Sequence, residues 1–305
     1  MSSFEYAVRP AAKKVTRAPA RPTAEPMRWM SPRVPASGAI GLAVLSFLAV
    51  VAVFGPVVWP VHPETQDLAN RLVPPWGFGG TAAHPLGTDT LGRDTLARVI
   101  AGARVSLPLS VVATAASGGV GVSLGVLAGY RGGWIDGAVS WLSDVQLAIP
   151  FVVFAIVITA AFGNSVGNVL ATLVVTGWVA YARVIRLQTR ALRGAAWMDA
   201  ARAMGAGPAR LLARHLLPNL AATAAILATQ QAGAMILYES SLSFLGLGLG
   251  GSTVTWGGMA ALGREAVFTA PWVAAIPGAV IAAAILGFNL TGDWLATRGR
   301  RQAWL

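Results

Sequence analysis

The sequence predicts an all-α integral membrane protein with six transmembrane helices and both termini in the cytoplasm. Three observations support this: an apolar composition, six long apolar runs and an asymmetric distribution of basic residues. Hydrophobic residues make up 55% of the 305 residues and charged residues only 11%, whereas soluble domains carry about 25% charged residues. A single soluble domain is therefore excluded, because too few polar side chains could cover a water-exposed surface. The lack of cysteine excludes a disulfide scaffold and thiolate metal sites.

Six apolar runs are each long enough to cross a bilayer, which takes about 20 residues. The predicted spans are 37–59, 105–130, 138–162, 166–186, 216–238 and 266–292. The first run is too long for a signal-peptide core of about 7–15 residues, so we expect an uncleaved span. A seventh uncharged run, 240–263, contains seven glycines, and each glycine disfavours helix by about 1 kcal/mol. We expect this run to be irregular or re-entrant chain packed against protein.

The basic residues distinguish the two sides of the membrane. Six spans that start inside place 18 of the 23 basic residues on one side. Because Lys and Arg accumulate in cytoplasmic loops, both termini are predicted to lie in the cytoplasm. The net charge of +11 then marks these loops and does not indicate a nucleic-acid partner. Residues 1–36, which are rich in Pro, Ala and Arg, are predicted to be a disordered cytoplasmic tail near anionic lipid, followed by a transmembrane domain at 37–305.

The sequence offers no convincing catalytic or metal site. A phosphate-binding loop needs a lysine after its glycines, but Lys13 and Lys14, the two lysines of the chain, have no glycine upstream. The three histidines are dispersed and form no zinc-binding motif. We therefore expect a non-catalytic chain that binds no metal or cofactor itself.

The segment 190–218, between the fourth and fifth spans, is expected to form a helix–turn–helix elbow on the cytoplasmic side. Asp199 suits the start of a helix, because a carboxylate complements the helix dipole. Gly205 and Gly207, followed by Pro208, can end that helix in a tight turn. A basic amphipathic loop lying on lipid headgroups is the alternative interpretation.

This elbow resembles the EAA loop of ABC-importer permeases. The family signature is Glu-Ala-Ala, three residues, Gly, nine residues, Ile, any residue and Leu-Pro, and its spacing is matched here without a gap. Two positions depart from it, since Asp199 replaces Glu and His215 replaces Ile. In the family this loop is the coupling helix that docks on a cytoplasmic ATPase. The resemblance assigns this contact to Asp199, Ala200, Ala201, Gly205, Ala206, Leu217 and Pro218.

Three further blocks resemble the permeases of dipeptide, oligopeptide and nickel importers, especially the second, C-type permease. The first block reads His84-Pro-Leu-Gly-Thr-Asp-Thr-Leu-Gly-Arg-Asp94. The second begins at Glu239 as Glu-Ser-Ser-Leu-Ser-Phe-Leu-Gly-Leu-Gly and continues at Thr255-Trp-Gly. The third is Phe288-Asn-Leu-Thr-Gly-Asp. The resemblance thus extends from the first span to the C-terminus.

Several residues in these blocks are candidates for function or packing. Asp89, Arg93 and Asp94 can form an ion-pair network that caps the structure, an interpretation we prefer to substrate binding; contact with a binding protein is the other possibility. Glu239, at the outer end of the fifth span, is predicted to be either a pathway or gate residue or a buried hydrogen-bonding partner. Glycines at 121, 125 and 129 recur every four residues and predict close helix packing.

The resemblance implies a type I ABC-importer permease fold and a permease subunit that imports dipeptides or oligopeptides across the bacterial cytoplasmic membrane. It implies a second homologous permease, two ATP-binding subunits (or one bifunctional pair) that hold ATP and Mg²⁺, and an extracytoplasmic solute-binding protein. ATP binding would move the coupling helices and switch access between the two faces. Peptide substrate and membrane lipid are the other expected partners, and nucleic acid is not one.

Other functions remain as alternatives. The same architecture could import nickel or glutathione. An ATP-independent secondary transporter or channel would need more charged or polar residues within the spans than this sequence has. A membrane-anchored interaction protein without a pathway is a third class.

Overall fold

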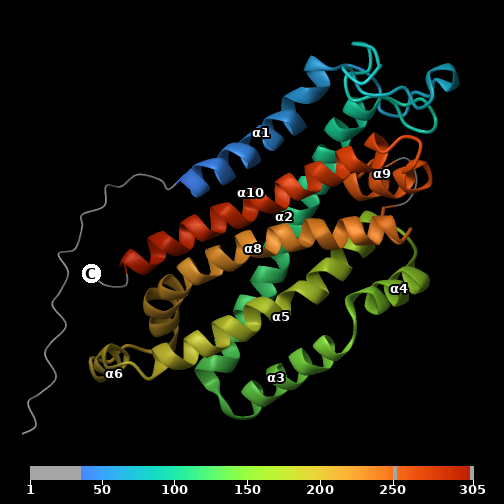
Figure 1. Cartoon of the computed structure of the whole chain (residues 1–305). Helices are drawn as coiled ribbons and strands as arrows, with labels where there is room; N and C mark the ends of the chain where they lie inside the picture. Colours follow the sequence, from blue (N-terminus) through green and yellow to red (C-terminus); the bar gives the residue numbers. More distant parts are fainter. Residues whose placement is uncertain (1–35, 250–252, 303–305) are drawn as a thin grey trace, which may run out of the picture. The chain divides into compact units, whose positions relative to one another are not determined.

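The computed structural model of the chain describes residues 36–249 and 253–302. Within these ranges every regular element is a helix, and the only extended pairing is an isolated bridge between Thr88 and Asp94. Apart from its last residue, the predicted tail 1–36 lies outside the described residues. The elements, in chain order, are α1 (Ala36–Val58), η1 (Leu68–Asn70), α2 (Thr95–Arg131), α3 (Gly133–Ala148), α4 (Phe151–Phe162), α5 (Val166–Arg193), α6 (Ala196–Ala203), α7 (Pro208–Arg210), η2 (Leu211–Leu216), α8 (Leu217–Phe244), α9 (Trp256–Gly263), η3 (Arg264–Ala266) and α10 (Trp272–Gln302) (Figure 1).

Five helical segments are long and apolar enough to cross a membrane: α1, α2, α5, the continuous run α7–η2–α8, and α10. Helices α3 and α4 together reach the length of a sixth span, but they are bent by 88° at Ile149–Pro150. Proline has no backbone N–H and disfavours helical geometry in the residue before it, which explains the break. The all-α membrane fold is therefore confirmed, whereas the predicted span 138–162 is two helices and not one.

Two helices do not begin where the predicted spans begin. Helix α2 begins ten residues before the predicted start at 105, since Asp94 caps it by accepting a hydrogen bond from the backbone N of Ala97 at 2.7 Å. Helix α10 begins at Trp272 and not at 266, because η3 occupies 264–266.

The glycine-rich run 240–263 was expected to be irregular or re-entrant chain, but part of it is helical. Its first residues complete α8, and its last eight form α9. Thr255 caps α9 by accepting a hydrogen bond from the backbone N of Gly258 at 3.0 Å. Burial of Trp256 and Met259 holds this short helix in place despite its three glycines. Tertiary packing thus overrides the low helix propensity of glycine.

The closest approach of two helices joins α2 to α5. A Cβ atom on the three α2 glycines would meet backbone oxygens of α5, at 2.3 Å from Gly121 to Trp178, 2.8 Å from Gly125 to Ala182 and 2.6 Å from Gly129 to Arg186. Both rows advance by four residues, about one helical turn, so the two backbones touch at three points over about two turns. The predicted packing role of these glycines is confirmed.

The other long helices are arranged around this pair. Helices α1, α10, α8 and α5 follow one another as neighbours, and α2 contacts α1, α8 and α5 (Figure 1). Helix α1 exposes large apolar side chains, such as Phe47 and Val53 at 66% each. Lipid is the environment that suits this surface.

We predict that Gly121→Ala destabilises the protein by about 1–3 kcal/mol, because the added methyl group has no space against the backbone of α5. Gly119→Ala is the matched control, since nothing lies within 4 Å of its Cβ position on the same helix. That change should be neutral or stabilise by up to about 1 kcal/mol through helix propensity. Thermal unfolding of the purified protein in detergent measures both, and equal stability of the two variants would contradict the packing argument.

Candidate functional site

The elbow between α5 and α8 is a compact helix–turn–helix, as predicted. Helix α6 turns Met198 and Ala201 inward, where they pack on Leu211, Leu216 and Leu220. Asp199 lies in the first turn of α6, and its exposed carboxylate pairs with Nη1 of Arg202 at 2.7 Å. The elbow therefore packs through an apolar core that it shares with α5 and α2, and its outer side is charged.

The turn after α6 depends on the backbone of Gly205, which has a φ of +82°. Nothing lies within 4 Å of a Cβ atom added there, so the requirement for glycine is conformational and not steric. Pro208 then starts α7, which continues through the π-helix η2 into α8. The second part of the elbow is thus the beginning of one helical run that extends from Pro208 to Phe244.

The structure places the residues of the signature on two sides of the elbow. Ala201 is buried in the core and Ala206 is half-buried. His215, at the position where the signature has Ile, lies beside Trp197, with 6.1 Å between the ring centroids. The signature residues that remain on the surface are Asp199, Ala200, Gly205, Leu217 and Pro218.

A buried ionic cluster joins the segment between α1 and α2 to the start of α2. We call it the loop cluster and define it as Glu64, Asp89, Arg93 and Arg98. Oδ2 of Asp89 accepts from Nε of Arg93 at 2.7 Å, and Nε of Arg98 lies 3.7 Å from the same oxygen. Glu64 bridges the two arginines, at 3.3 Å from Nη1 of Arg93 and 2.6 Å from Nη1 of Arg98. Asp89, Arg93 and Arg98 are buried, so the charges compensate one another inside the protein.

The predicted pairing of Asp89 with Arg93 is confirmed, but Asp94 does not join them. Its carboxylate caps α2, accepts from Nε1 of Trp59 at 3.2 Å and lies 2.8 Å from Nδ1 of His84. Glu64 was not predicted as a member, because it lies 29 positions before Arg93 in the chain. No local pattern indicates such a distant partner.

Glu239 is enclosed near the end of α8 that is remote from the elbow, with 1% of its surface exposed. Its Oε1 accepts from Oγ of Ser243 at 2.8 Å, and its Oε2 accepts from Oγ of Ser106 at 3.3 Å. The same Ser106 oxygen accepts from the backbone N of Trp256 at 3.4 Å. Glu239 therefore ties α8 to α2 and to the start of α9.

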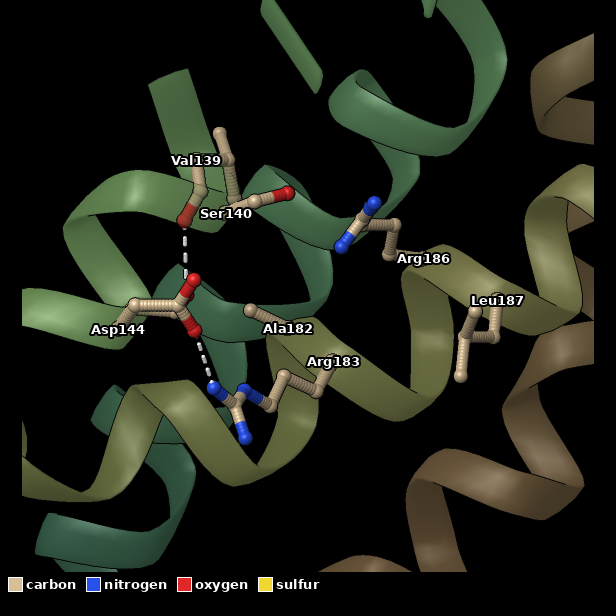
Figure 2. Close-up of a pocket in the computed structure, with 8 residues that line it drawn as sticks. Val139, Ser140, Asp144, Ala182, Arg183, Arg186 and Leu187 are labelled. Atoms are coloured by element: carbon tan, nitrogen blue, oxygen red, sulfur yellow. Dashed lines mark hydrogen bonds and ion pairs between the residues drawn. The ribbon is translucent and has the colours of Figure 1, made fainter. Parts of the chain in front are cut away.

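Ion pairs also join α3 to the C-terminal half of α5. Figure 2 shows Asp144 and Arg183 facing each other at a small pocket of about 190 Å³, with Arg186 on its other side. Arg186 and Arg190 both pair with the buried Asp136 of α3. These pairs were not predicted from the sequence, because the break after α3 determines which helix faces meet.

Comparison with known proteins identifies the family. Residues 121–301 match the model of the binding-protein-dependent transport system inner membrane component, and residues 37–75 match the N-terminal transmembrane domain of oligopeptide transport permease C. The chain belongs to this family of permeases. The resemblance to ABC-importer permeases is thereby confirmed, and the chain is a multi-pass inner membrane permease. The first match includes the elbow and Glu239, and the second includes Glu64.

Named relatives span most of the permease. The dipeptide transport system permease protein DppC of Alkalihalophilus pseudofirmus is 35% identical over 256 residues, which cover 84% of this chain and 83% of the relative. The glutathione transport system permease protein GsiD of Pectobacterium atrosepticum is 35% identical over 257 residues, covering 84% of each chain. The oligopeptide transport system permease protein OppC of Bacillus subtilis is 31% identical over 256 residues, covering 84% of this chain and 82% of the relative.

We predict that Asp89→Asn destabilises the permease by about 3–5 kcal/mol, because it leaves two buried arginines with Glu64 alone. Asp199→Asn is the control, since its carboxylate is 67% exposed in an isolated pair. That change should cost about 1 kcal/mol or less. Thermal unfolding in detergent compares the two variants, and a similar small loss in both would contradict a structural role for the loop cluster.

Proposed function

We propose that this permease is a subunit of an ATP-driven importer that moves dipeptides or oligopeptides into the cytoplasm. A second homologous permease completes the pathway. The elbow carries this proposal, because it joins an exposed coupling surface to a helix that runs on to Glu239. The names of two of the relatives above support peptide cargo. Glutathione, itself a short peptide, is the alternative that a third relative supports, and nickel remains a further alternative.

The proposed partners follow from the family. Two ATP-binding subunits, or one bifunctional pair, hold ATP and Mg²⁺ and dock on the exposed elbow residues Asp199, Ala200, Gly205, Leu217 and Pro218. Buried Ala201 and half-buried Ala206 support that surface from behind. This chain contributes no catalytic group and binds no cofactor in the proposed cycle.

In the proposed mechanism, closure of the ATPase dimer displaces the elbow as a rigid body. The run α7–η2–α8 carries this displacement along the helix axis to Glu239, Ser243 and their contacts on α2 and α9. The contact of Glu239 with Ser106 of α2 would then differ between the two access states. On this basis we propose Glu239 as a gate residue.

The proposed topology has six spans, with α3 and α4 together as the third and both termini in the bacterial cytoplasm. Arg183, Arg186, Arg190 and Arg193 near the end of α5 support an inner position for the elbow. The loop cluster and α9 then face the opposite side, where an extracytoplasmic solute-binding protein delivers the cargo. Residues 1–36 form a cytoplasmic tail, residues 37–305 form the permease domain, and lipid covers the apolar face of α1.

A secondary transporter with this fold would act without ATP. It would need titratable groups within the spans that face a pathway, whereas the described spans enclose Glu239 among hydroxyl groups and pair Asp136 with arginines. Dependence of uptake on ATP hydrolysis by partner subunits distinguishes the two functions. Uptake driven by an ion gradient alone would contradict the importer.

We predict that Gly205→Val uncouples ATP hydrolysis from transport. A β-branched residue at a φ of +82° strains the turn by about 1–3 kcal/mol and displaces the docking surface. Gly207→Val is the matched control, because Gly207 has a φ of −70° and an equally open Cβ position. The measurements are peptide uptake and binding-protein-stimulated ATP hydrolysis by the reconstituted complex.

Gly205→Val should reduce peptide uptake per ATP hydrolysed while the permease still inserts into the membrane. Gly207→Val should retain most of the wild-type ratio. Normal coupling in Gly205→Val, or the same loss in both variants, would count against the role of the turn.

A further inference from the structure

A cavity of about 650 Å³ opens at the end of α8 that is remote from the elbow. Its walls come from the loop cluster, from the residues that follow α8, and from α9 with η3. Its volume is within the range of about 300–1,000 Å³ that is typical of small-molecule sites. Neither the family match nor the elbow gives this cavity a role.

The cavity contains charges of both signs. Three arginines line it, Arg93, Arg98 and Arg264, together with the carboxylates Glu64 and Glu265. Arg93 and Arg98 are bound by Glu64 and by Asp89 behind them, so they are already compensated.

Arg264 and Glu265 differ from the loop cluster in being exposed and without an ion-pair partner among the described residues. The guanidinium carbon of Arg264 lies 5.7 Å from the ring centroid of Phe244, an arrangement that orients the group over an aromatic surface. Arg264 is therefore a positioned cation that is available to a carboxylate. Glu265 is available to an ammonium group.

The remaining walls are apolar. Phe244 and Leu262 line the cavity with 41% and 44% of their surfaces exposed, and Met259 closes it from α9. Exposed apolar side chains beside convergent charged groups are typical of a ligand site. A site with both signs of charge and an apolar wall suits a zwitterionic ligand that carries apolar side chains. It suits an acidic side chain of a partner protein less well, because the carboxylates of the site would repel that side chain.

We infer that this cavity is a binding site for a short zwitterionic peptide, with Arg264 holding the terminal carboxylate and Glu265 facing the terminal ammonium. The inference rests on the proposed function, because it assigns a location to the cargo on the extracytoplasmic side. The permease then receives its substrate at a site of its own before the spans change access. Arg264 is a residue that determines specificity for a free C-terminal carboxylate.

The test measures binding of dialanine and of its C-terminal amide by titration calorimetry. The sample is the complete complex of both permeases and the ATP-binding subunits, purified without the binding protein. Arg264→Gln should weaken dialanine binding by about tenfold or more, the effect of losing one charge-assisted hydrogen bond. The amide should bind weakly to the wild type and be unaffected by the substitution.

Arg71→Gln is the matched control, because Arg71 is an exposed arginine in the segment that joins α1 to α2 and does not line the cavity. Its dialanine affinity should equal that of the wild type. Equal binding of dialanine and its amide, or equal affinities of the Arg264 and Arg71 variants, would overturn the inference. So would an Arg264→Gln complex that keeps its dialanine affinity but binds the binding protein less tightly, since the cavity would then be a protein contact.

A second measurement is the uptake of dialanine by vesicles that contain the wild-type complex, binding protein and ATP. It distinguishes failure of the binding site from failure of the proposed function. Uptake without any dialanine binding to the complex alone would overturn the site and leave the proposed function standing. Dialanine binding that depends on Arg264, together with no ATP-driven uptake, would support the site and contradict the proposed function.

Discussion

The close contact between the backbones of α2 and α5 is the constraint on which the rest of the permease depends. Three glycines, one turn apart, allow it, and the positions that they meet on α5 are also one turn apart. Such an approach fixes the register of the two helices, because any larger residue would separate them. The ends of the two helices are thereby fixed in position. Arg98 lies in the first turn of α2, and Arg186 and Arg190 lie in the last turns of α5.

Two sets of ion pairs lie at these helix ends. At one end of α2 a buried cluster compensates two arginines with two carboxylates, and Asp94 caps the helix beside it. At the far end of α5 two arginines hold Asp136 and thereby attach α3, which also packs on α2. Between them, Ser106 connects α2 to Glu239 and to the start of α9. The buried carboxylate of Glu239 is thus hydrogen-bonded within the protein, which a polar group at membrane depth requires.

Features with a local cause could be predicted from the sequence, and features with a distant cause could not. The glycine row and the turn at Gly205 follow from spacing and backbone conformation within a few residues. The positions of the long spans follow from apolar length, but the bend at Pro150 divides one of them. The bridging role of Glu64 and the formation of α9 depend on residues that come together only in the folded chain. Burial of Trp256 offsets glycine content that, read alone, indicates loop.

The length of α8 has a mechanical consequence. Its 28 residues make a rod of about 42 Å. If one end is held, each degree of tilt moves the other end by about 0.7 Å, by the geometry of a rod of that length. The hydrogen bonds that join its far end to other elements, from Ser106 to Glu239 and from Thr255 to Ser243, have a tolerance of only a few tenths of an ångström. A rotation of a single degree at the elbow is therefore enough to break or remake them, so small angular changes can produce discrete states.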